Sequence, residues 1–312
     1  MNFEQQALAL YTYQMEHNSV YRKFVHLSRG KTFEPARLDE IPCLPISFFK
    51  THRVATGDYE TYFESSGTTG MERSRHYIAD KEAYLRNAVD LFSYHYGKDP
   101  TEYAWLALLP GYLDNPHSSL ISMVKHFIDS SQYGSSGFFL HDMDDLYDQL
   151  NMNIKKELPT ILLGVSFALL DFSENYKLPR NKLIVMETGG MKGRRKELTR
   201  KELHDMLTAS LGVDHIHSEY GMTELQSQSY ARDDGWFRSN HRLQVIVRPV
   251  DDPWGEQEIG KTGRLDLIDL ANRESCPFIA SSDLGMKRDK MSFKVLGRMD
   301  NSDIRGCNLL YQ

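Results

Sequence analysis

Residues 64–70 read ESSGTTG, in which two pairs of hydroxyl residues are each followed by a glycine. Such a run has no hydrophobic face and no strong helix or strand preference, so its propensity is that of a turn. A loop of this composition can also wrap a polyphosphate, because its glycines let backbone N–H groups approach closely and its hydroxyls supply further donors. Taken alone, the run indicates an ordinary flexible loop more often than a phosphate site. The rest of the chain decides between the two.

The segments on either side of this loop alternate between helical and strand patterns. Apolar residues recur at helical spacing over residues 3–28, and Asp80 is placed to cap a helix that runs through Phe92. Short apolar runs are typical of buried strands at residues 103–109, 182–186 and 243–247, and the apolar run 161–170 predicts a further core element. This alternation predicts a layered α/β fold.

From Trp254 onward the pattern changes to short alternating segments, such as residues 264–270 (RLDLIDL). This pattern favours antiparallel strands in a smaller subdomain. We therefore expect a single domain over residues 1–312, with an α/β core over about 1–250 and a β-rich subdomain over about 251–312.

Composition limits the class of partner and the compartment. A net charge of -6 argues against a nucleic-acid or anionic-membrane surface, so a small-molecule substrate is expected. Cys43, Cys276 and Cys307 lie far apart without metal-finger spacing, which favours a reduced compartment. The first residues carry no signal-peptide pattern, and the run 161–170 is about half the roughly 20 residues that cross a bilayer. These features predict a cytoplasmic protein without a membrane span.

Downstream segments make the phosphate-site interpretation of ESSGTTG stronger. Residues 218–224 (SEYGMTE) bring together an aromatic ring, a turn residue, a hydroxyl and a carboxylate, which are the groups needed to stack a base, contact a phosphate and hold Mg²⁺. The glycines of 187–190 (ETGG) follow an apolar strand, and residues 281–285 (SSDLG) and 297–300 (GRMD) add polar groups. Residues 255–262 match the phosphate loop of many NTPases, but a strand pattern follows where that loop needs a helix, so a turn is expected there.

With these segments in order, the chain resembles the acyl-adenylate-forming superfamily, which includes the AMP-forming acyl-CoA synthetases. Residues 65–70 look like its phosphate loop, residues 220–224 match its Tyr-Gly-x-Thr-Glu motif, and residues 260–267 resemble its strand-borne Gly-x-x-Gly segment. Residues 41–50 and 304–308 are similar to the LuxE-type acyl-protein synthetases within that superfamily. The resemblance implies an ATP- and Mg²⁺-dependent ligase that converts a carboxylic acid, fatty or aromatic, to acyl-AMP and pyrophosphate.

The resemblance also implies roles for individual residues. Nucleotide binding would fall to Ser65, Ser66, Gly67, Thr68, Thr69 and Gly70 at the β and γ phosphates, Tyr220 stacked on adenine beside Gly189 and Gly190, and Asp283 and Arg298 at the ribose. Thr223 would touch the α-phosphate, and Glu224 would hold Mg²⁺. Fixed donors and a metal stabilise the charge that develops on phosphoryl oxygens without having to reorganise.

The chain departs from the superfamily pattern after Asp300, where typical members continue into a mobile lid domain that carries a catalytic lysine. Only twelve residues follow Asp300, so the lid is expected to be absent, and Lys261 or Arg305 are weak candidates for its charge. Cys307 is the acyl acceptor that the LuxE resemblance implies. Transfer to coenzyme A or to a carrier protein, and a nucleotide-binding pseudoenzyme, remain open as alternatives.

His215 and His217 alternate around Ile216 just before the Tyr-Gly motif. They could ligate a metal, but no third ligand stands at a suitable spacing, so we expect them to be strand residues beside the site.

Overall fold

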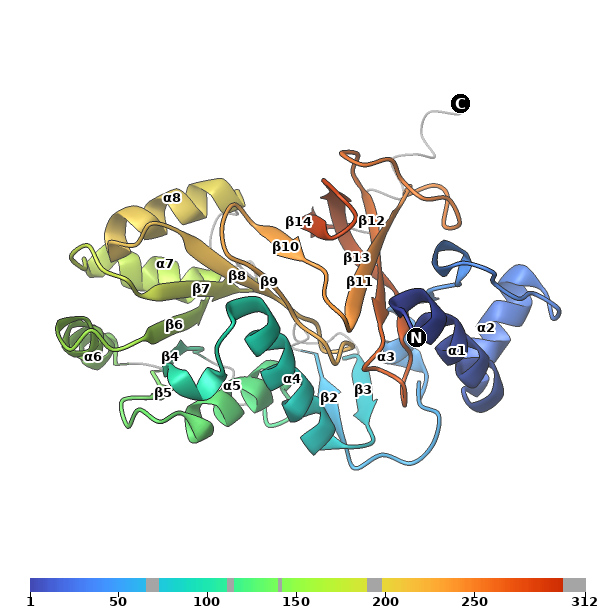
Figure 1. The fold of residues 1–312 in the computed structure, drawn as a ribbon, viewed down its shortest axis with the longest axis horizontal. Helices are drawn as coiled ribbons and strands as arrows, with labels where there is room; N and C mark the ends of the chain where they lie inside the picture. The colour runs from blue at the N-terminus through green and yellow to red at the C-terminus, as the bar shows by residue number, and fades with distance from the viewer. Residues whose placement is uncertain (66–72, 111–114, 140–141, 190–197, 300–312) are drawn as a thin grey trace. The chain divides into compact units, whose positions relative to one another are not determined.

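The computed structural model describes residues 1–65, 73–110, 115–139, 142–189 and 198–299 (Figure 1). The chain forms two compact units. One consists of Met1–Tyr62, Gly70–Asp80 and Arg238–Gln312, and the other of Phe63–Thr69 and Lys81–Phe237. Among the described residues, the chain passes from one unit to the other within the short strand β2 (Thr61–Glu64), between Asp80 and Lys81, and within the short strand β10 (Trp236–Arg238).

The unit built around residues 81–237 alternates helices with strands. Its elements are α4 (Lys81–Tyr96), η2 (Pro100–Glu102), β4 (Ala104–Leu108), α5 (Ser119–Ser130), β5 (Gly137–Phe138), α6 (Met143–Lys155), β6 (Thr160–Val165), α7 (Ser166–Asn175), β7 (Ile184–Thr188), α8 (Arg200–Leu211), β8 (Ile216–Tyr220) and β9 (Ser229–Ala231). The sheet has the order β5-β4-β6-β7-β8-β9. Its strands are parallel except β9, which runs antiparallel to β8. The predicted α/β class is confirmed.

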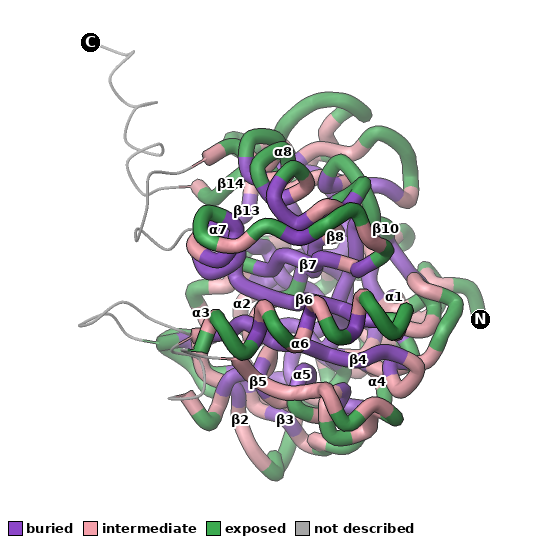
Figure 2. Tube along the Cα trace, turned by 90° about the vertical axis from the view of Figure 1, so that its left-hand side faces the viewer, coloured by how far each residue is buried: buried purple, intermediate pink, exposed green. Residues whose placement is uncertain are grey.

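The central strands of this sheet are apolar because both of their faces are covered. Every residue of β4 and β6 is buried, as Figure 2 shows. The strand predicted at 103–109 is β4, and the strand predicted at 182–186 is β7, which lies two residues further along. The run 161–170 is two elements, since β6 ends at Val165 and α7 begins at Ser166. Its residues are buried in both elements, so no change in exposure marks the boundary.

An aromatic cluster holds α4 and α5 against the sheet. The ring of Phe92 on α4 lies 5.2 Å from Trp105 on β4, 5.7 Å from Phe127 on α5 and 5.8 Å from Tyr230 on β9, measured between centroids. The contacts with Trp105 and Tyr230 are edge-on, a favourable arrangement for aromatic quadrupoles. These contacts therefore pack α4 and α5 together against β4 and β9.

The other unit contains an antiparallel sheet and the amino-terminal helices. Its elements are α1 (Phe3–His17), α2 (Ser19–Arg29), η1 (Leu38–Glu40), β1 (Leu44–Pro45), α3 (Phe48–Thr51), β3 (Arg75–Ile78), β11 (Leu243–Arg248), β12 (Gly263–Asp269), β13 (Phe278–Lys287) and β14 (Ser292–Arg298). Strands β11 to β14 pair antiparallel in chain order, and β1 joins β13 in parallel. The predicted antiparallel pattern after Trp254 is confirmed by β12, β13 and β14.

The helix predicted over residues 3–28 is interrupted at Asn18. The Asn18 backbone ends α1, and its side-chain oxygen accepts a hydrogen bond from the Tyr21 N–H at the start of α2. The same side chain donates to the Ser275 carbonyl at 2.8 Å, and Asn18 is fully buried. Asparagine is a favoured N-cap residue, so this side chain stabilises a break that hydrophobic spacing alone does not reveal.

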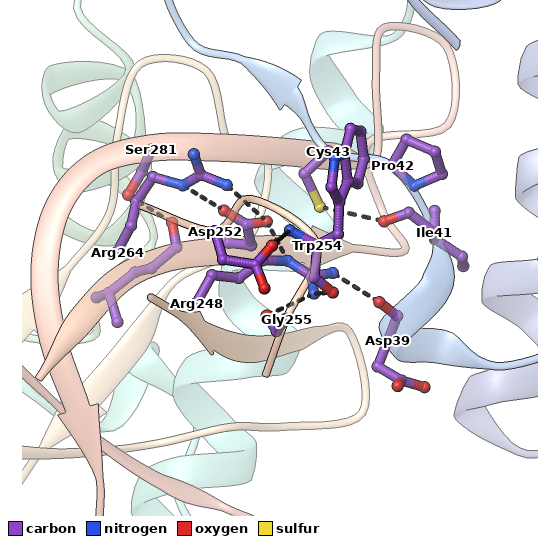
Figure 3. A network of polar contacts seen from close by, with 12 residues as sticks. Asp39, Ile41, Pro42, Cys43, Arg248, Asp252, Trp254, Gly255, Arg264 and Ser281 are labelled. Carbon is purple, nitrogen blue, oxygen red and sulfur yellow. Dashed lines mark hydrogen bonds and ion pairs between the residues drawn. The ribbon is translucent and has the colours of Figure 1, made fainter. Parts of the chain in front are cut away.

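The false match to an NTPase loop lies in the connection between β11 and β12, where Arg248 anchors the backbone (Figure 3). Its guanidinium donates to Asp266 and to the carbonyls of Asp39, Trp254 and Gly255, at distances from 2.7 to 3.0 Å. No helix follows Thr262, since β12 begins at Gly263. The expectation of a turn between strands is confirmed.

The two cysteines in the described ranges, Cys43 and Cys276, are buried and form no disulfide. Burial raises the pKa of the Cys276 thiol to about 12, so this cysteine is unreactive and packs as a small apolar side chain. Cys307 lies outside the described residues. Within the described ranges, every helix is too short or too polar to serve as a membrane span.

Candidate functional site

The segment that leads into the 65–70 loop is fixed by contacts within its own unit. The Phe63 ring packs edge-on against Tyr84 at 4.8 Å, and the Glu64 N–H donates to the His117 carbonyl at 2.9 Å. Asn115 Nδ2 donates to the Glu64 carbonyl. Ser65 is the last residue described before the loop, and the predicted site residues Ser66, Gly67, Thr68, Thr69 and Gly70 lie outside the described residues.

The carboxyl end of β7 carries a buried carboxylate, Glu187, that is held from helix α8. Arg200 Nε lies 3.3 Å from Glu187 Oε1, and His204 Nε2 lies 3.7 Å from the same oxygen, which is longer than a hydrogen bond. Burial favours the neutral acid, but the interactions with His204 and Arg200 outweigh it and lower the pKa of Glu187 below its ordinary value. Glu187 is therefore ionised at neutral pH.

The residues after Glu187 turn the chain away from the sheet. Ser166, at the start of α7, donates to Glu187 Oε2 and to the Gly189 carbonyl, both at 3.1 Å. Gly189 has a φ of 69°, a left-handed conformation that favours glycine. Gly189 thus forms a tight turn directly after β7, and Gly190 lies outside the described residues.

The neighbouring strand β8 ends with a second buried carboxyl, Glu219. The register pairs Glu219 with Thr188, and Thr188 Oγ1 donates a hydrogen bond to Glu219 Oε2 at 2.5 Å. Burial raises the pKa of Glu219 to about 7; the hydrogen bond from Thr188 opposes this rise, and the nearby charge of Glu187 adds to it. The pKa values of these two carboxyl groups are therefore shifted in opposite directions.

The Tyr220 to Glu224 segment follows at the carboxyl edge of the parallel sheet. Tyr220 is 8% exposed, and its ring lies 5.6 Å from that of Phe237. Gly189 and Tyr220 are the next residues beyond the paired Thr188 and Glu219, so the predicted adenine residues leave adjacent strands at the same level. Glu224 is 6% exposed in the turn that closes with a Leu225 N–H to Met222 carbonyl hydrogen bond, and Thr223 is half-buried.

Glu224 fits the Mg²⁺ role by the chemistry of its donor set. Mg²⁺ is commonly held by one or two carboxylates together with substrate phosphates rather than by an all-protein cage. Across the described residues, no three His, Cys, Asp or Glu side chains gather closely enough to hold a metal on their own. A single carboxylate beside a phosphate site is compatible with a metal that arrives with its nucleotide.

His217, one of the two histidines before the Tyr-Gly motif, is a structural residue of β8. Its Nδ1 lies 2.9 Å from the Tyr96 hydroxyl, and the two rings stack at 5.7 Å. Burial and the charge of Arg232 lower the pKa of His217 to about 4, so the ring is neutral at physiological pH. The expectation of a strand residue is confirmed for His217 and is wrong for His215, which lies just before β8 begins at Ile216.

Asp283 and Arg298, the predicted ribose residues, lie in the antiparallel unit on paired positions of β13 and β14. Arg298 Nε lies 3.2 Å from Asp283 Oδ1, with side-chain exposures of 76% and 7%. An arginine that exposed adds little stability through the pair, so its guanidinium is available to a ligand at small cost. Asp283 also has its N–H bonded to Ser281 Oγ, which orients the residue.

Sequence reasoning assigned no role to Glu219, Thr188, Arg200 or His204. Glu187 directly follows the apolar run 182–186, so a carboxylate at the end of a buried strand was a usable signal, but the polar residues 215–218 (HIHS) before Glu219 give no such signal. The contacts from Arg200 and His204 depend on how α8 packs, and no local pattern reveals them.

No family model and no curated protein matches the sequence. Solved structures of acyl-CoA ligases do resemble the fold. An open conformation of 2-hydroxyisobutyryl-CoA ligase in complex with 2-HIB-AMP and CoA superposes with a TM-score of 0.69 at 12% identity, over 95% of this chain and 69% of that one. The structure of ATP-bound MatB from Rhodopseudomonas palustris superposes with a TM-score of 0.56 at 15% identity, over 76% of this chain and 47% of that one.

The chain thus spans about half of the MatB structure and about two thirds of the 2-hydroxyisobutyryl-CoA ligase structure. Identities this low establish the fold alone. A parallel α/β sheet followed by a curled antiparallel sheet is the architecture of the large domain of adenylate-forming ligases, and this chain has that fold.

Proposed function

We propose that this protein activates a carboxylic acid with ATP to form acyl-AMP and then transfers the acyl group to a thiol. The observation that carries the proposal is the position of the Tyr220-Gly221-Met222-Thr223-Glu224 segment, which begins at the last residue of β8, at the carboxyl edge of the parallel sheet. Ligands of open α/β sheets bind at this edge. The fold is shared with ligases solved with ATP or with an acyl-AMP, which supports the same assignment.

In the first step, a carboxylate oxygen of the acid attacks the α-phosphorus of ATP. The bond from the α-phosphorus to the bridging oxygen breaks, and pyrophosphate leaves with the electron pair. Thr223 would donate to the α-phosphate, and donors of the 65–70 loop would bind the departing phosphates. Mg²⁺, when bound at Glu224, would neutralise part of the phosphate charge. Asp283 and Arg298 would bind the ribose, and Tyr220 with Gly189 and Gly190 the adenine.

In the second step, a thiolate attacks the acyl carbonyl carbon and AMP leaves. The resemblance of residues 304–308 to the LuxE branch favours Cys307 of the same chain as the acceptor. Arg305 is two residues away, and a nearby cation lowers a thiol pKa and raises the thiolate fraction. Coenzyme A is the second candidate, because the 2-hydroxyisobutyryl-CoA ligase of the same fold was solved with CoA.

The identity of the acid follows from none of these residues, so a panel of fatty and aromatic acids is the appropriate set of substrates. A cytoplasmic location, a single adenylation domain and the absence of nucleic-acid partners remain predictions from the sequence.

Intact-mass measurement after incubation with ATP, Mg²⁺ and each acid tests the transfer. We expect a hydroxylamine-sensitive acyl adduct that is absent without ATP and absent in Cys307→Ser. The matched control is Cys43→Ser, since Cys43 is buried and should leave the adduct intact. Acyl-CoA formation without an adduct would assign the acceptor to coenzyme A, and no acyl product with any thiol would contradict the proposed transfer.

A further inference from the structure

We propose that Glu219 is a positioning residue for the nucleotide site: its buried carboxyl, bonded to Thr188 and packed under Gly221, fixes the loop that carries Thr223 and Glu224. This inference rests on the proposed function for the identity of the ligand. It assigns a role to a side chain that the adenylation chemistry itself does not use.

The first step of the argument is the bond between the strand ends. Glu219 is 7% exposed, and its Oε2 accepts from Thr188 Oγ1 across paired positions of β8 and β7. Side chains alternate along a strand, so these two residues share one face of the sheet and Glu187 points to the other. The hydrogen bond from Thr188 therefore connects the carboxyl end of β8 to β7. It lies on the face of the sheet opposite to the one on which Arg200 and His204 contact Glu187.

The second step is the packing between Glu219 and the loop. A Cβ placed on Gly221 would lie 2.6 Å from Glu219 Oε1, closer than atoms can approach. Gly221 has no positive φ, so the backbone does not itself call for glycine; any other residue there would require the carboxyl at the end of the Glu219 side chain to shift. The Glu219 carboxyl therefore lies against the backbone at Gly221, two residues before Thr223.

The third step is the charge around Glu219. Glu187 on β7 faces it through the sheet with a negative charge, while Tyr230 on β9 and Tyr96 on α4 stay neutral because burial raises their pKa values. Arg200 and His204 on α8 pair with Glu187 instead. The pKa of Glu219 is about 7, so the group is protonated below neutrality and ionised above it.

Ionisation of Glu219 leaves a buried charge with one hydrogen bond and a like charge nearby. Such a group recruits water or moves, because an under-solvated carboxylate is costly. Protonation leaves Oε2 free to keep the Thr188 bond. The loop after Gly221 is therefore held in place by the protonated acid and loosened by the ionised one.

Hydrogen exchange of the ligand-free protein tests the loop directly. As pH rises toward 7, we expect the protection of a peptide that covers residues 219–225, corrected for intrinsic exchange, to fall by up to about tenfold per pH unit and then to level off. In Glu219→Gln this pH dependence should vanish. Thr188→Val keeps the carboxyl but removes the donor, and it should lower protection at acidic pH. The exposed Glu82→Gln on α4 is the matched control and should behave as wild type.

Calorimetry of Mg²⁺·ATP binding over the same range supplies the functional readout. Ionisation of ATP affects all variants equally, so the quantity to compare is the ratio of the wild-type Kd to the Glu219→Gln Kd. We expect this ratio to rise several-fold between pH 6 and 8.5. A constant ratio together with an unchanged exchange profile in Glu219→Gln would overturn the positioning role, as would a pH dependence that persists in that variant and so originates at another group.

The two proposals fail in different ways. If wild type binds no ATP at any pH while its exchange profile still depends on Glu219, the adenylation proposal fails and the positioning of the loop stands. If wild type binds ATP and the exchange profile of the loop does not depend on Glu219, the positioning role fails and the adenylation proposal stands.

Discussion

Glu187 and Glu219 end neighbouring parallel strands and have pKa values shifted in opposite directions. The pKa of Glu187 lies below its ordinary value because of His204 and Arg200. Burial and the charge of Glu187 raise the pKa of Glu219 to about 7. Environments that separate the pKa values of two nearby acids are typical of functional sites. Here they occur at the sheet edge from which the Tyr-Gly segment departs.

The raised pKa of Glu219 makes stability depend on pH. Below pH 4.5, its ordinary pKa, both folded and unfolded chains keep this proton. Between 4.5 and about 7 only the folded chain keeps it, so the free energy of unfolding falls as pH rises and is fully reduced above 7. A tenfold change in the acid dissociation constant between the two states corresponds to about 1.4 kcal/mol. Urea unfolding of wild type and Glu219→Gln should show the variant gaining up to about 3 kcal/mol relative to wild type from pH 4.5 to 8.

Because wild type and Glu219→Gln are compared at each pH, the contributions of other titrating groups to the unfolding free energy cancel. A difference in unfolding free energy that stays constant with pH would mean that Glu219 is ionised in the folded protein at neutral pH.

Arg248 supplies a second test, of the antiparallel unit. Its guanidinium and the Asp266 carboxylate are each 1% exposed and lie 2.8 Å apart. Arg248→Met leaves buried carbonyls without their donor and Asp266 with only Arg264, which should cost about 3 to 5 kcal/mol of unfolding free energy. Lys125→Met is the control, since it breaks the exposed pair with Asp129 and should cost less than about 1 kcal/mol.

Trp254 reports on this network because its carbonyl accepts from Arg248. Its fluorescence during denaturant unfolding is the appropriate signal, and equal midpoints for wild type and Arg248→Met would show that the network contributes no stability.

Asp283 is predicted to bind the ribose hydroxyls. Asp283→Ala should weaken ATP binding by about 1.5 to 3 kcal/mol, the value of charge-assisted hydrogen bonds. Calorimetry with 2′,3′-dideoxy-ATP provides the control for this role. Wild type should bind the analogue more weakly than ATP by a similar free energy. Asp283→Ala should bind the analogue only slightly more weakly than it binds ATP. Equal affinity of wild type for ATP and the analogue would remove Asp283 from the ribose site.

The elements that sequence predicts well are those with a local signal. The strands β4 and β11 follow from short apolar runs, and α4 begins at Lys81, directly after the predicted cap Asp80. Strand β1 does not follow from any local pattern, because Leu44 pairs with Ile279 from the far end of the chain. Likewise, Asn18 breaks a continuous helical pattern by bonding to Ser275, which only the folded chain brings near.

The residues of the candidate site also fall into those with a local sequence signal and those whose role depends on distant contacts. Tyr220, Thr223 and Glu224 are identifiable from their spacing, since the chemistry of a nucleotide site requires those groups in close succession. Glu219 stands in the same segment, but its importance depends on burial, on Thr188 from another strand and on the charge of Glu187. Those quantities are set by packing between distant segments.

Adenylation is the central claim, and acid-dependent exchange of pyrophosphate into ATP measures it most directly. Across a panel of fatty and aromatic acids with Mg²⁺, we expect exchange with at least one acid. Glu224→Gln, which removes the charge of a hard oxygen ligand, should lower exchange by about tenfold or more and weaken Mg²⁺-dependent ATP binding. The exposed Glu258→Gln should match wild type. Exchange that needs no acid, or no ATP binding at millimolar concentration by a folded protein, would contradict the claim.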